Sequence, residues 1–346
     1  MICPAATSRR PDYAAANTNL DGAASISESM RGMSVFTCVD QPQLEQFLAG
    51  YSVGVLRDFA GVTTGVENTN YFVYTSAGAY VLTVFERVPH EDIPFCLGLA
   101  AHLAEHGIPS AQPVASNAGA YLNQICGKPA ALWVKLPGRS AESPSLKQCR
   151  EVGGALARMH RAAASFEAKR GNPCGLAWAR QTAAALKLKL SGGERALMES
   201  ELAMWQAMPA GAAPAGVVHA DLFVDNVLFE GERLCGVIDF YYACTDLLLL
   251  DLATAVNDWC KTADGAQVDA KKQSAMVDAY CEERPLSAAE KKLWNQTLRR
   301  AALRFWLSRA YDKHFPRDGE MILIKDPEIY RRLLVFHLEN GRGGGG

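Results

Sequence analysis

The sequence lacks the features that define several large classes of protein. Lys and Arg number 35 and Asp and Glu number 37, which leaves a net charge of −2 and no basic excess for binding nucleic acid. No apolar run reaches the roughly 20 residues that a membrane-spanning helix needs, because the leucines at 247–250 lie between Asp246 and Asp251. We therefore expect neither nucleic acid nor a membrane among its partners.

Cysteine occurs at ten positions, but no two of these form a C-x-x-C pair. Close cysteine spacing is typical of structural zinc sites, and dense cysteine frameworks are typical of small secreted domains. Cys149 and Cys235 lie within apolar runs instead, as buried reduced thiols do. In a chain of 346 residues this pattern predicts a cytoplasmic protein with free thiols.

Both ends of the chain look like extensions of the folded core. Residues 1–32 are rich in Ala, Ser, Asn and Arg and carry no periodic apolar pattern. Arg9 and Arg10 resemble the start of an export signal, but no apolar segment follows them. Residues 336–346 end in glycines, which supply no packing surface. We expect a disordered or non-native extension over 1–32, a flexible tail over 336–346, and no function in either.

Residues 33–136 have the pattern of a small lobe rich in β-strands. Short runs of β-branched and aromatic residues between turns predict strands over Leu56–Val62, Asn70–Thr75, Ala79–Glu86 and Lys128–Leu136. Pro94 to His106, closed by Gly107, predicts one helix between them. Pro137 then ends the last strand and marks a hinge.

Residues 137–335 have the pattern of a larger, mainly helical lobe. Apolar residues recur at steps of three and four between Leu146 and Met159, which is the periodicity of an amphipathic helix. The segments 266–281 and 287–314 are helical by the same criterion. The predicted fold is therefore α+β, with two lobes: a small antiparallel-sheet N-lobe and a larger helical C-lobe.

The most informative motif is an H-x-D-x-x-x-x-N loop that runs from His219 to Asn226 and leaves the apolar strand at 217–218. In phosphoryl-transfer enzymes a loop of this spacing supplies an Asp that orients the acceptor hydroxyl and an Asn that holds magnesium. We take Asp221 as the catalytic residue. His219 is expected to brace the loop.

A hairpin follows this loop and brings a second acidic residue to it. Asn226 opens the strand at 227–229, Gly231 supplies the turn, and the strand at 234–238 runs back to Asp239. An antiparallel hairpin returns its last residue beside its first, so Asn226 and Asp239 should meet at one end. Two oxygen ligands suit a hard cation that keeps water and phosphate oxygens in its shell. We predict that Asn226 and Asp239 bind Mg²⁺.

Several longer stretches resemble one enzyme superfamily, which includes fructosamine kinases, choline kinases and aminoglycoside phosphotransferases. The resemblance spans about residues 33–335 and is clearest at 65–73, 80–86 and 219–226. Within the superfamily, the Asp-Phe-Tyr-Tyr-Ala-Cys run from Asp239 and the Asn-Asp-Trp-Cys run from Asn257 resemble the bacterial homoserine kinase branch. The resemblance implies ATP and Mg²⁺ as cofactors and L-homoserine as the acceptor. It also implies a product, O-phospho-L-homoserine, that belongs to threonine biosynthesis.

The same resemblance places the nucleotide in the N-lobe. It implies that the glycine-containing turn at 61–70 covers the ATP phosphates and that the strand at 131–135 meets adenine at the hinge. The residues expected to bind the nucleotide are Gly65, Asn68, Asn70, Thr83, Arg87, Trp133 and Lys135. One of them departs from the pattern, because many relatives carry Lys or Arg where this chain has Thr83. Arg87 shares the strand face of Thr83 and is the candidate substitute, and its alternative is a solvated charge at the strand end.

The acceptor site belongs in the helical lobe, beside Asp221. A substrate carboxylate favours a bidentate Arg, and Arg304, flanked by Leu303, Phe305 and Trp306, is the Arg expected to face inward. Asp246 and Asp258 are the candidates for binding the ammonium group. Tyr242 is also expected to bind the substrate.

Other functions remain open on the sequence alone. A choline or ethanolamine kinase would need an aromatic box for the cation, and an aminoglycoside kinase would need an acidic cleft. A non-catalytic, nucleotide-binding pseudokinase is the alternative from another class. The Thr at position 83 favours it slightly, whereas the intact set of Asp221, Asn226 and Asp239 argues against it. The sequence leaves the oligomeric state undetermined.

Overall fold

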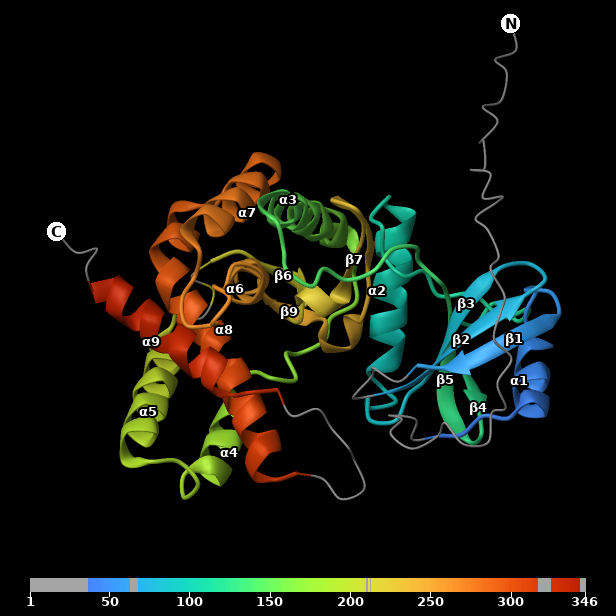
Figure 1. Cartoon of the computed structure of the whole chain (residues 1–346), viewed down its shortest axis with the longest axis horizontal. Coiled ribbons are helices and arrows are strands. Elements are labelled where there is room, and N and C mark those ends of the chain that lie inside the picture. The colour runs from blue at the N-terminus through green and yellow to red at the C-terminus, as the bar shows by residue number, and fades with distance from the viewer. Residues whose placement is uncertain (1–36, 63–67, 210, 212, 317–324, 343–346) are drawn as a thin grey trace, which may run out of the picture.

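The computed structural model describes residues 37–62, 68–209, 211, 213–316 and 325–342, which form two lobes (Figure 1). The expected extension at 1–32 lies outside these ranges. The chain enters the smaller lobe first and crosses once into the larger one, so the two lobes follow the sequence. Among the described residues, no helix combines the length and the hydrophobicity that crossing a bilayer requires.

The N-lobe is built on one antiparallel sheet whose strands are ordered β1-β2-β3-β5-β4. These are β1 (Leu56–Gly61), β2 (Thr69–Thr75), β3 (Ala79–Val84), β4 (Asn123–Ile125) and β5 (Lys128–Val134). Helix α1 (Gln41–Leu48) packs on one face, where Leu44 and Phe47 join Val73 and Leu82 in a core. On the other face, Ala131 and Trp133 pack into the core of the C-lobe together with helix α2 (Ile93–Glu105).

The C-lobe is a set of helices around α6, which is buried along nearly its whole length. The helices are α3 (Leu146–Ala162), α4 (Leu176–Leu186), α5 (Gly192–Ala207), α6 (Leu248–Trp259), α7 (Ala270–Glu283), α8 (Ala288–His314) and α9 (Glu328–Arg342). Helices α3 and α7 touch at Gly153, where an added Cβ would lie 2.1 Å from the Met276 carbonyl oxygen. Only glycine allows the two backbones to approach this closely.

Two short β-ribbons flank the loop at 219–226. Strand β6 (Ala215–Val218) pairs antiparallel with β9 (Cys244–Leu247), and β7 (Val227–Glu230) pairs with β8 (Arg233–Val237). The short helices η2 (Val224–Asn226) and η3 (Phe240–Tyr242) connect them, and η1 (Ala163–Ser165) follows α3. The ribbons place both ends of the predicted hairpin beside the loop that follows β6.

The strands and helices expected from the sequence are present, and the predicted α+β class is confirmed. Local signals explain the helix starts, because α1, α3, α5 and α8 each begin with a capping box. The tail expected from residue 336 is wrong in its extent, because α9 continues to Arg342. His337 is 3% exposed, and its Nε2 lies 2.7 Å from Oδ1 of Asn257. This packing holds the helix in place despite the glycines that follow it.

Candidate active site

The catalytic loop leaves β6 and is held by its own histidine. Nε2 of His219 bonds to the carbonyl oxygen of Ile238 at 3.0 Å, and its Nδ1 accepts from the backbone N–H of Asp221 at 3.3 Å. The ring also packs on Phe240, with centroids 4.8 Å apart. His219 thus ties the loop to the end of β8, in the bracing position that the sequence suggested.

Asp251, from the buried helix α6, fixes the backbone of the same loop. Its carboxylate accepts hydrogen bonds from the N–H groups of His219 and Ala220, both at 2.6 Å. Ala220 has φ of +63°, a left-handed conformation that costs a non-glycine residue about 1–2 kcal/mol. The bonds from the loop to Asp251, together with the bond from Arg304 to the Ala220 carbonyl oxygen, offset this strain.

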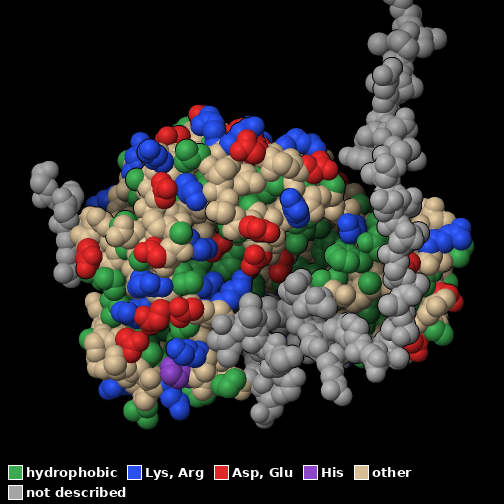
Figure 2. Space-filling model, in the orientation of Figure 1, with side chains coloured by type: hydrophobic (Ala, Val, Ile, Leu, Met, Phe, Trp, Pro, Cys, Tyr) green, Lys and Arg blue, Asp and Glu red, His purple; other side chains and the backbone are tan. Residues whose placement is uncertain are grey.

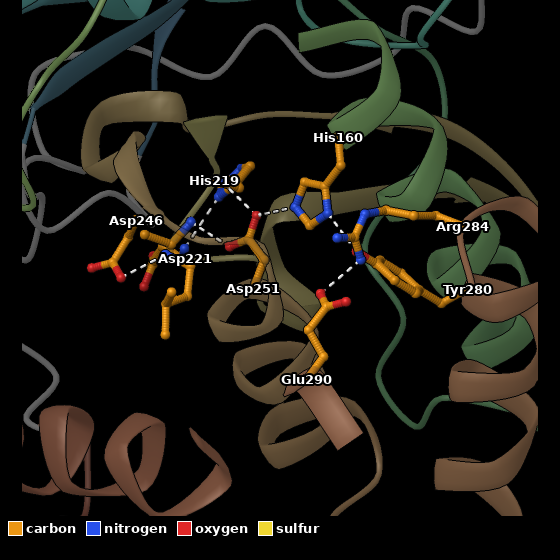
Figure 3. A network of polar contacts seen from close by, with 10 residues as sticks. His160, His219, Asp221, Asp246, Asp251, Tyr280, Arg284 and Glu290 are labelled. Atoms are coloured by element: carbon orange, nitrogen blue, oxygen red, sulfur yellow. Dashed lines mark hydrogen bonds and ion pairs between the residues drawn. The ribbon is translucent and has the colours of Figure 1, made fainter. Parts of the chain in front are cut away.

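A chain of polar contacts extends from Asp251 to the start of α8 (Figure 3). Arg284 donates from Nη1 to the Tyr280 hydroxyl at 3.1 Å, and that hydroxyl lies 2.8 Å from Nδ1 of His160. Nε2 of His160 donates to the Asp251 carboxylate at 3.1 Å. Glu290 binds Arg284 at 2.8 Å and completes the chain.

Replacing Asp251 should destabilise the protein and lower its activity. Burial alone would raise the pKa of Asp251, but the bond and charge of His160 and the contacts with His219 lower it below the ordinary value. The carboxylate therefore adds stability above pH about 4, which is lost as the pH falls through its lowered pKa. We expect Asp251→Asn to cost about 3 kcal/mol at pH 7. In chemical denaturation at several pH values, the difference from the unmodified protein should shrink in acid, and a constant difference would contradict this role.

The hairpin brings Asn226 and Asp239 together, as the sequence predicted. Val227 pairs with Val237, and the N–H of Ile238 donates to the Asn226 carbonyl oxygen at 3.0 Å. The Asn226 side-chain nitrogen donates to Asp221, at 2.8 Å to its carbonyl oxygen and 3.2 Å to Oδ2. Its amide oxygen consequently points away from Asp221 and is available to a cation. Asp239 has φ of +66°, a conformation that Asp tolerates better than most residues.

The donor set of these two side chains fits a magnesium ion. Within the described ranges, no group of three or more His, Cys, Asp or Glu residues could hold a metal. Mg²⁺ commonly binds one or two carboxylates and takes its remaining ligands from phosphates and water. One carboxylate and one amide oxygen beside Asp221 match that kind of site.

Asp221 itself lies next to a buried arginine. Nη1 of Arg304 is 3.7 Å from Oδ1 of Asp221 and donates to the Ala220 carbonyl oxygen at 2.5 Å. Burial raises the pKa of Asp221, and the charge of Arg304 opposes that effect. The guanidinium lies over the rings of Tyr242 and Phe305, at 5.1 Å and 4.1 Å from their centroids. An acid and a buried cation therefore lie side by side in this loop.

The nucleotide candidates fall on the sheet face that looks toward the C-lobe. Register places Asn70 opposite Thr83, and Thr83 opposite Ala131. The Thr83 hydroxyl donates to Asn70 at 2.7 Å and accepts from the Tyr241 hydroxyl at 3.4 Å. Thr83 therefore connects the sheet to the segment that follows Asp239, without supplying a charge.

The other residues expected to bind the nucleotide differ from one another in burial and in contacts. The indole N–H of Trp133 is buried and donates to no group in the described part of the chain, so it can meet a ligand. Lys135 extends over the Phe72 ring at 5.4 Å, and its backbone N–H is bonded to the Ala79 carbonyl oxygen. Asn68 is buried and accepts from the N–H of Glu86, and Arg87 is exposed. Gly65 lies outside the described residues.

The residues expected to bind the acceptor differ in burial and in their contacts within the chain. Asp258 is buried and accepts from the Val224 N–H, Lys261 and Tyr330, which fastens it within the C-lobe. Asp246 is partly exposed on β9 and contacts Arg300 and Asn172. No sequence pattern pointed to Asn172, whose partner Asp246 is 74 positions away in the chain.

Figure 2 shows that the surface is hollowed between the two lobes and that apolar side chains line the hollow. Acidic side chains gather beside it on the side of the C-lobe.

Comparison with known proteins gives one consistent family. The family model described as the phosphotransferase enzyme family matches residues 58–286. The chain is 48% identical to homoserine kinase of Methylobacillus flagellatus over 302 residues, which cover 87% of this chain and 94% of that protein. It is 43% identical to homoserine kinase of Neisseria meningitidis over 303 residues, with coverage of 88% and 99%.

Solved structures agree on the fold. Amicoumacin kinase, in complex with AMP-PNP and Ca²⁺, aligns with a TM-score of 0.65 at 16% identity, covering 88% of this chain and 94% of that one. At this identity the match concerns the fold alone, and it confirms the predicted two-lobed kinase-like architecture.

Proposed function

Because the chain belongs to the phosphotransferase enzyme family, in its homoserine kinase branch, we propose that it transfers the γ-phosphoryl group of ATP to the hydroxyl of L-homoserine. The products are O-phospho-L-homoserine and ADP. The observation that carries the proposal is the meeting of Asp221, Asn226 and Asp239 at the mouth of the β7–β8 hairpin, with Arg304 beside Asp221.

Asp221 is the residue that orients the acceptor. The hydroxyl of L-homoserine donates to its carboxylate, and the hydroxyl oxygen then attacks the γ-phosphorus while the bond to the ADP oxygen breaks. The hydroxyl proton passes to Asp221. Arg304 lies 3.7 Å from the Asp221 carboxylate and keeps a positive charge beside the reacting oxygens. Positioning and charge neutralisation of this kind supply most of the catalysis in phosphoryl transfer.

Asn226 and Asp239 would hold Mg²⁺, which neutralises the charge of the phosphates when it is bound. The bonds from Asn226 to Asp221 tie the metal ligand to the acceptor-orienting residue. Any shift of one therefore moves the other, and the spacing between acceptor and phosphate stays fixed.

The nucleotide would lie against the sheet face that carries Asn70, Thr83, Trp133 and Lys135. Tyr241 follows Asp239 by two positions and contacts Thr83, which in turn contacts Asn70. We therefore assign Asn70 and Thr83 to the phosphate end of the nucleotide and Lys135 to the hinge end. Arg87 and Gly65 complete the proposed phosphate contacts. We place the enzyme in the cytoplasm, in keeping with the free thiols of the nine cysteines that the structure describes.

Substrate preference tests the proposal directly. A pocket built for an amino acid leaves buried charges unpaired when the ligand lacks a carboxylate or an ammonium group, which lowers specificity on the order of a hundredfold or more. We expect kcat/KM for L-homoserine to exceed that for choline, ethanolamine and kanamycin by at least that factor. L-serine should also be poor, because its hydroxyl falls one carbon short.

The measurement is ADP release, coupled to NADH oxidation, with each acceptor in turn. ATP hydrolysis without any acceptor is subtracted. A higher kcat/KM for choline than for L-homoserine would overturn the proposal, as would the absence of turnover with every acceptor.

A further inference from the structure

Two arginine–carboxylate pairs lie one helical turn apart along α8. Arg304 pairs with Asp221 at the catalytic loop, and Arg300 donates from Nη2 to Oδ2 of Asp246 at 2.6 Å. Four residues on an α-helix advance about 6 Å. The second pair therefore lies on the same helix face as the first, about 6 Å farther from the catalytic loop.

We propose that Arg300 and Asp246 bind the carboxylate and the ammonium group of the acceptor, and so select an amino acid with a hydroxyl at its far end. The inference rests on the proposed kinase activity and assigns the groups that recognise its substrate.

Arg300 has an unused donor. The residue is 7% exposed, and its guanidinium carbon lies 4.7 Å from the centroid of the Trp205 ring. Its Nε–H is buried and donates to no acceptor in the described part of the chain. A buried N–H without an acceptor is costly, so such groups are normally satisfied by water or a ligand. A carboxylate is the strongest acceptor for a guanidinium edge.

Asp246, the partner of Arg300, has an unused acceptor position. Its Oδ2 receives Arg300 and the Asn172 side-chain nitrogen at 2.7 Å, and its Oδ1 receives the Leu247 N–H at 2.7 Å. A carboxylate accepts about four hydrogen bonds, so one position remains. Asp246 is partly exposed, and that position can receive an ammonium group. Arg300 and Asp246 thus offer opposite charges to the two charged groups of one amino acid.

The length of the substrate matches the spacing of the two pairs. The hydroxyl oxygen and the carboxylate carbon of extended L-homoserine are about 5 Å apart. With the hydroxyl at Asp221, the carboxylate reaches the level of Arg300. Arg304 is a poorer candidate, because it already donates to the Ala220 carbonyl oxygen and to Sγ of Cys174 and sits at the hydroxyl end.

Two analogues of L-homoserine separate the roles. 3-Aminopropan-1-ol lacks the carboxylate, and 4-hydroxybutanoate lacks the ammonium group. We expect the unmodified enzyme to prefer L-homoserine over each by at least about a hundredfold in kcat/KM. In Arg300→Gln the preference over 3-aminopropan-1-ol should fall at least tenfold, and Arg300→Lys should restore part of it. In Asp246→Asn the preference over 4-hydroxybutanoate should fall at least tenfold.

A ratio of two substrates in one preparation does not depend on the fraction of folded enzyme, so partial unfolding cannot imitate the result. Where an analogue turns over too slowly, its inhibition constant against L-homoserine gives the same comparison. The matched control is Arg299→Gln, which breaks the neighbouring buried pair with Glu201, bonded at 2.8 Å from Nε. It should cost stability and leave both ratios within twofold.

Unchanged ratios in Arg300→Gln and Asp246→Asn, or an equal change in Arg299→Gln, would overturn the inference. Failure of the unmodified enzyme to phosphorylate L-homoserine would instead overturn the proposed function. The two failures are therefore distinguishable within one set of assays.

Discussion

Asp221→Asn should lower kcat by about 10³-fold or more, because the amide cannot take the proton of the acceptor hydroxyl. The KM for ATP should change little, since Asp221 is not among the proposed nucleotide or metal ligands. Asn is nearly isosteric with Asp, so the loop contacts of the backbone remain. Steady-state rates with L-homoserine and a separate ATP-binding titration measure the two effects.

Stability separates this catalytic role from a structural one. Burial raises the pKa of Asp221, so its ionised form is disfavoured in the folded protein. The folded state is therefore most stabilised in acid, and that contribution is lost as the pH rises from the ordinary Asp value through the raised pKa. At pH 7 Asp221→Asn should consequently unfold at the same temperature as the unmodified protein or higher. A variant that retains near-normal kcat would remove Asp221 from catalysis.

The same residue predicts the acid limb of the pH profile. The carboxylate must be ionised to accept the proton, so kcat/KM should fall as the pH drops through its pKa. Because that pKa is raised, the fall begins above the ordinary value of about 3.9. Asp225→Asn serves as the matched control, since Asp225 lies in the same loop, is exposed and pairs with Lys325 at 2.9 Å. Its profile should coincide with that of the unmodified enzyme.

Asp239→Ala should abolish measurable phosphoryl transfer at ordinary magnesium concentrations, with a loss of about 10³-fold or more. Its carboxylate is the charged ligand of the proposed metal site, and removing it leaves a neutral amide to hold a dication. Asn226→Ala should cost less, because an amide contributes less than a carboxylate. Asn226→Ala also removes the hydrogen bonds from the Asn226 side chain to Asp221, so part of the effect of this substitution should appear in kcat.

Magnesium titrations test whether Asn226 and Asp239 share one metal site. Plots of rate against free Mg²⁺ should shift to higher concentration in both variants, and further in Asp239→Ala. Direct binding of Mn²⁺ in the presence of AMP-PNP, followed by electron paramagnetic resonance, gives a readout that is independent of turnover. Magnesium dependence identical to that of the unmodified enzyme in both variants would rule out a shared metal site.

Local sequence predicted the geometry of the loop at 219–226 and of the hairpin that follows it. The spacing of His219, Asp221 and Asn226 and the turn at Gly231 are short-range features, so a hairpin that joins Asn226 to Asp239 follows from the chain itself. The strands and helices likewise followed from periodicity and capping residues. Each of these signals lies within about ten residues, where backbone preference and side-chain spacing act directly.

Tertiary structure decided the parts that depend on distant contacts. Nothing in the sequence indicated that Asp251 would hold a strained Ala220, or that His160 and Tyr280 would support it from two other helices. The different partners of Arg300 and Arg304 were equally hidden, because both residues share one helix face and differ in what β6 and β9 bring against them. The expected tail was wrong over 336–342 for the same reason. Burial against α6 and α8 stabilises α9, and a composition dominated by terminal glycines cannot reveal such packing.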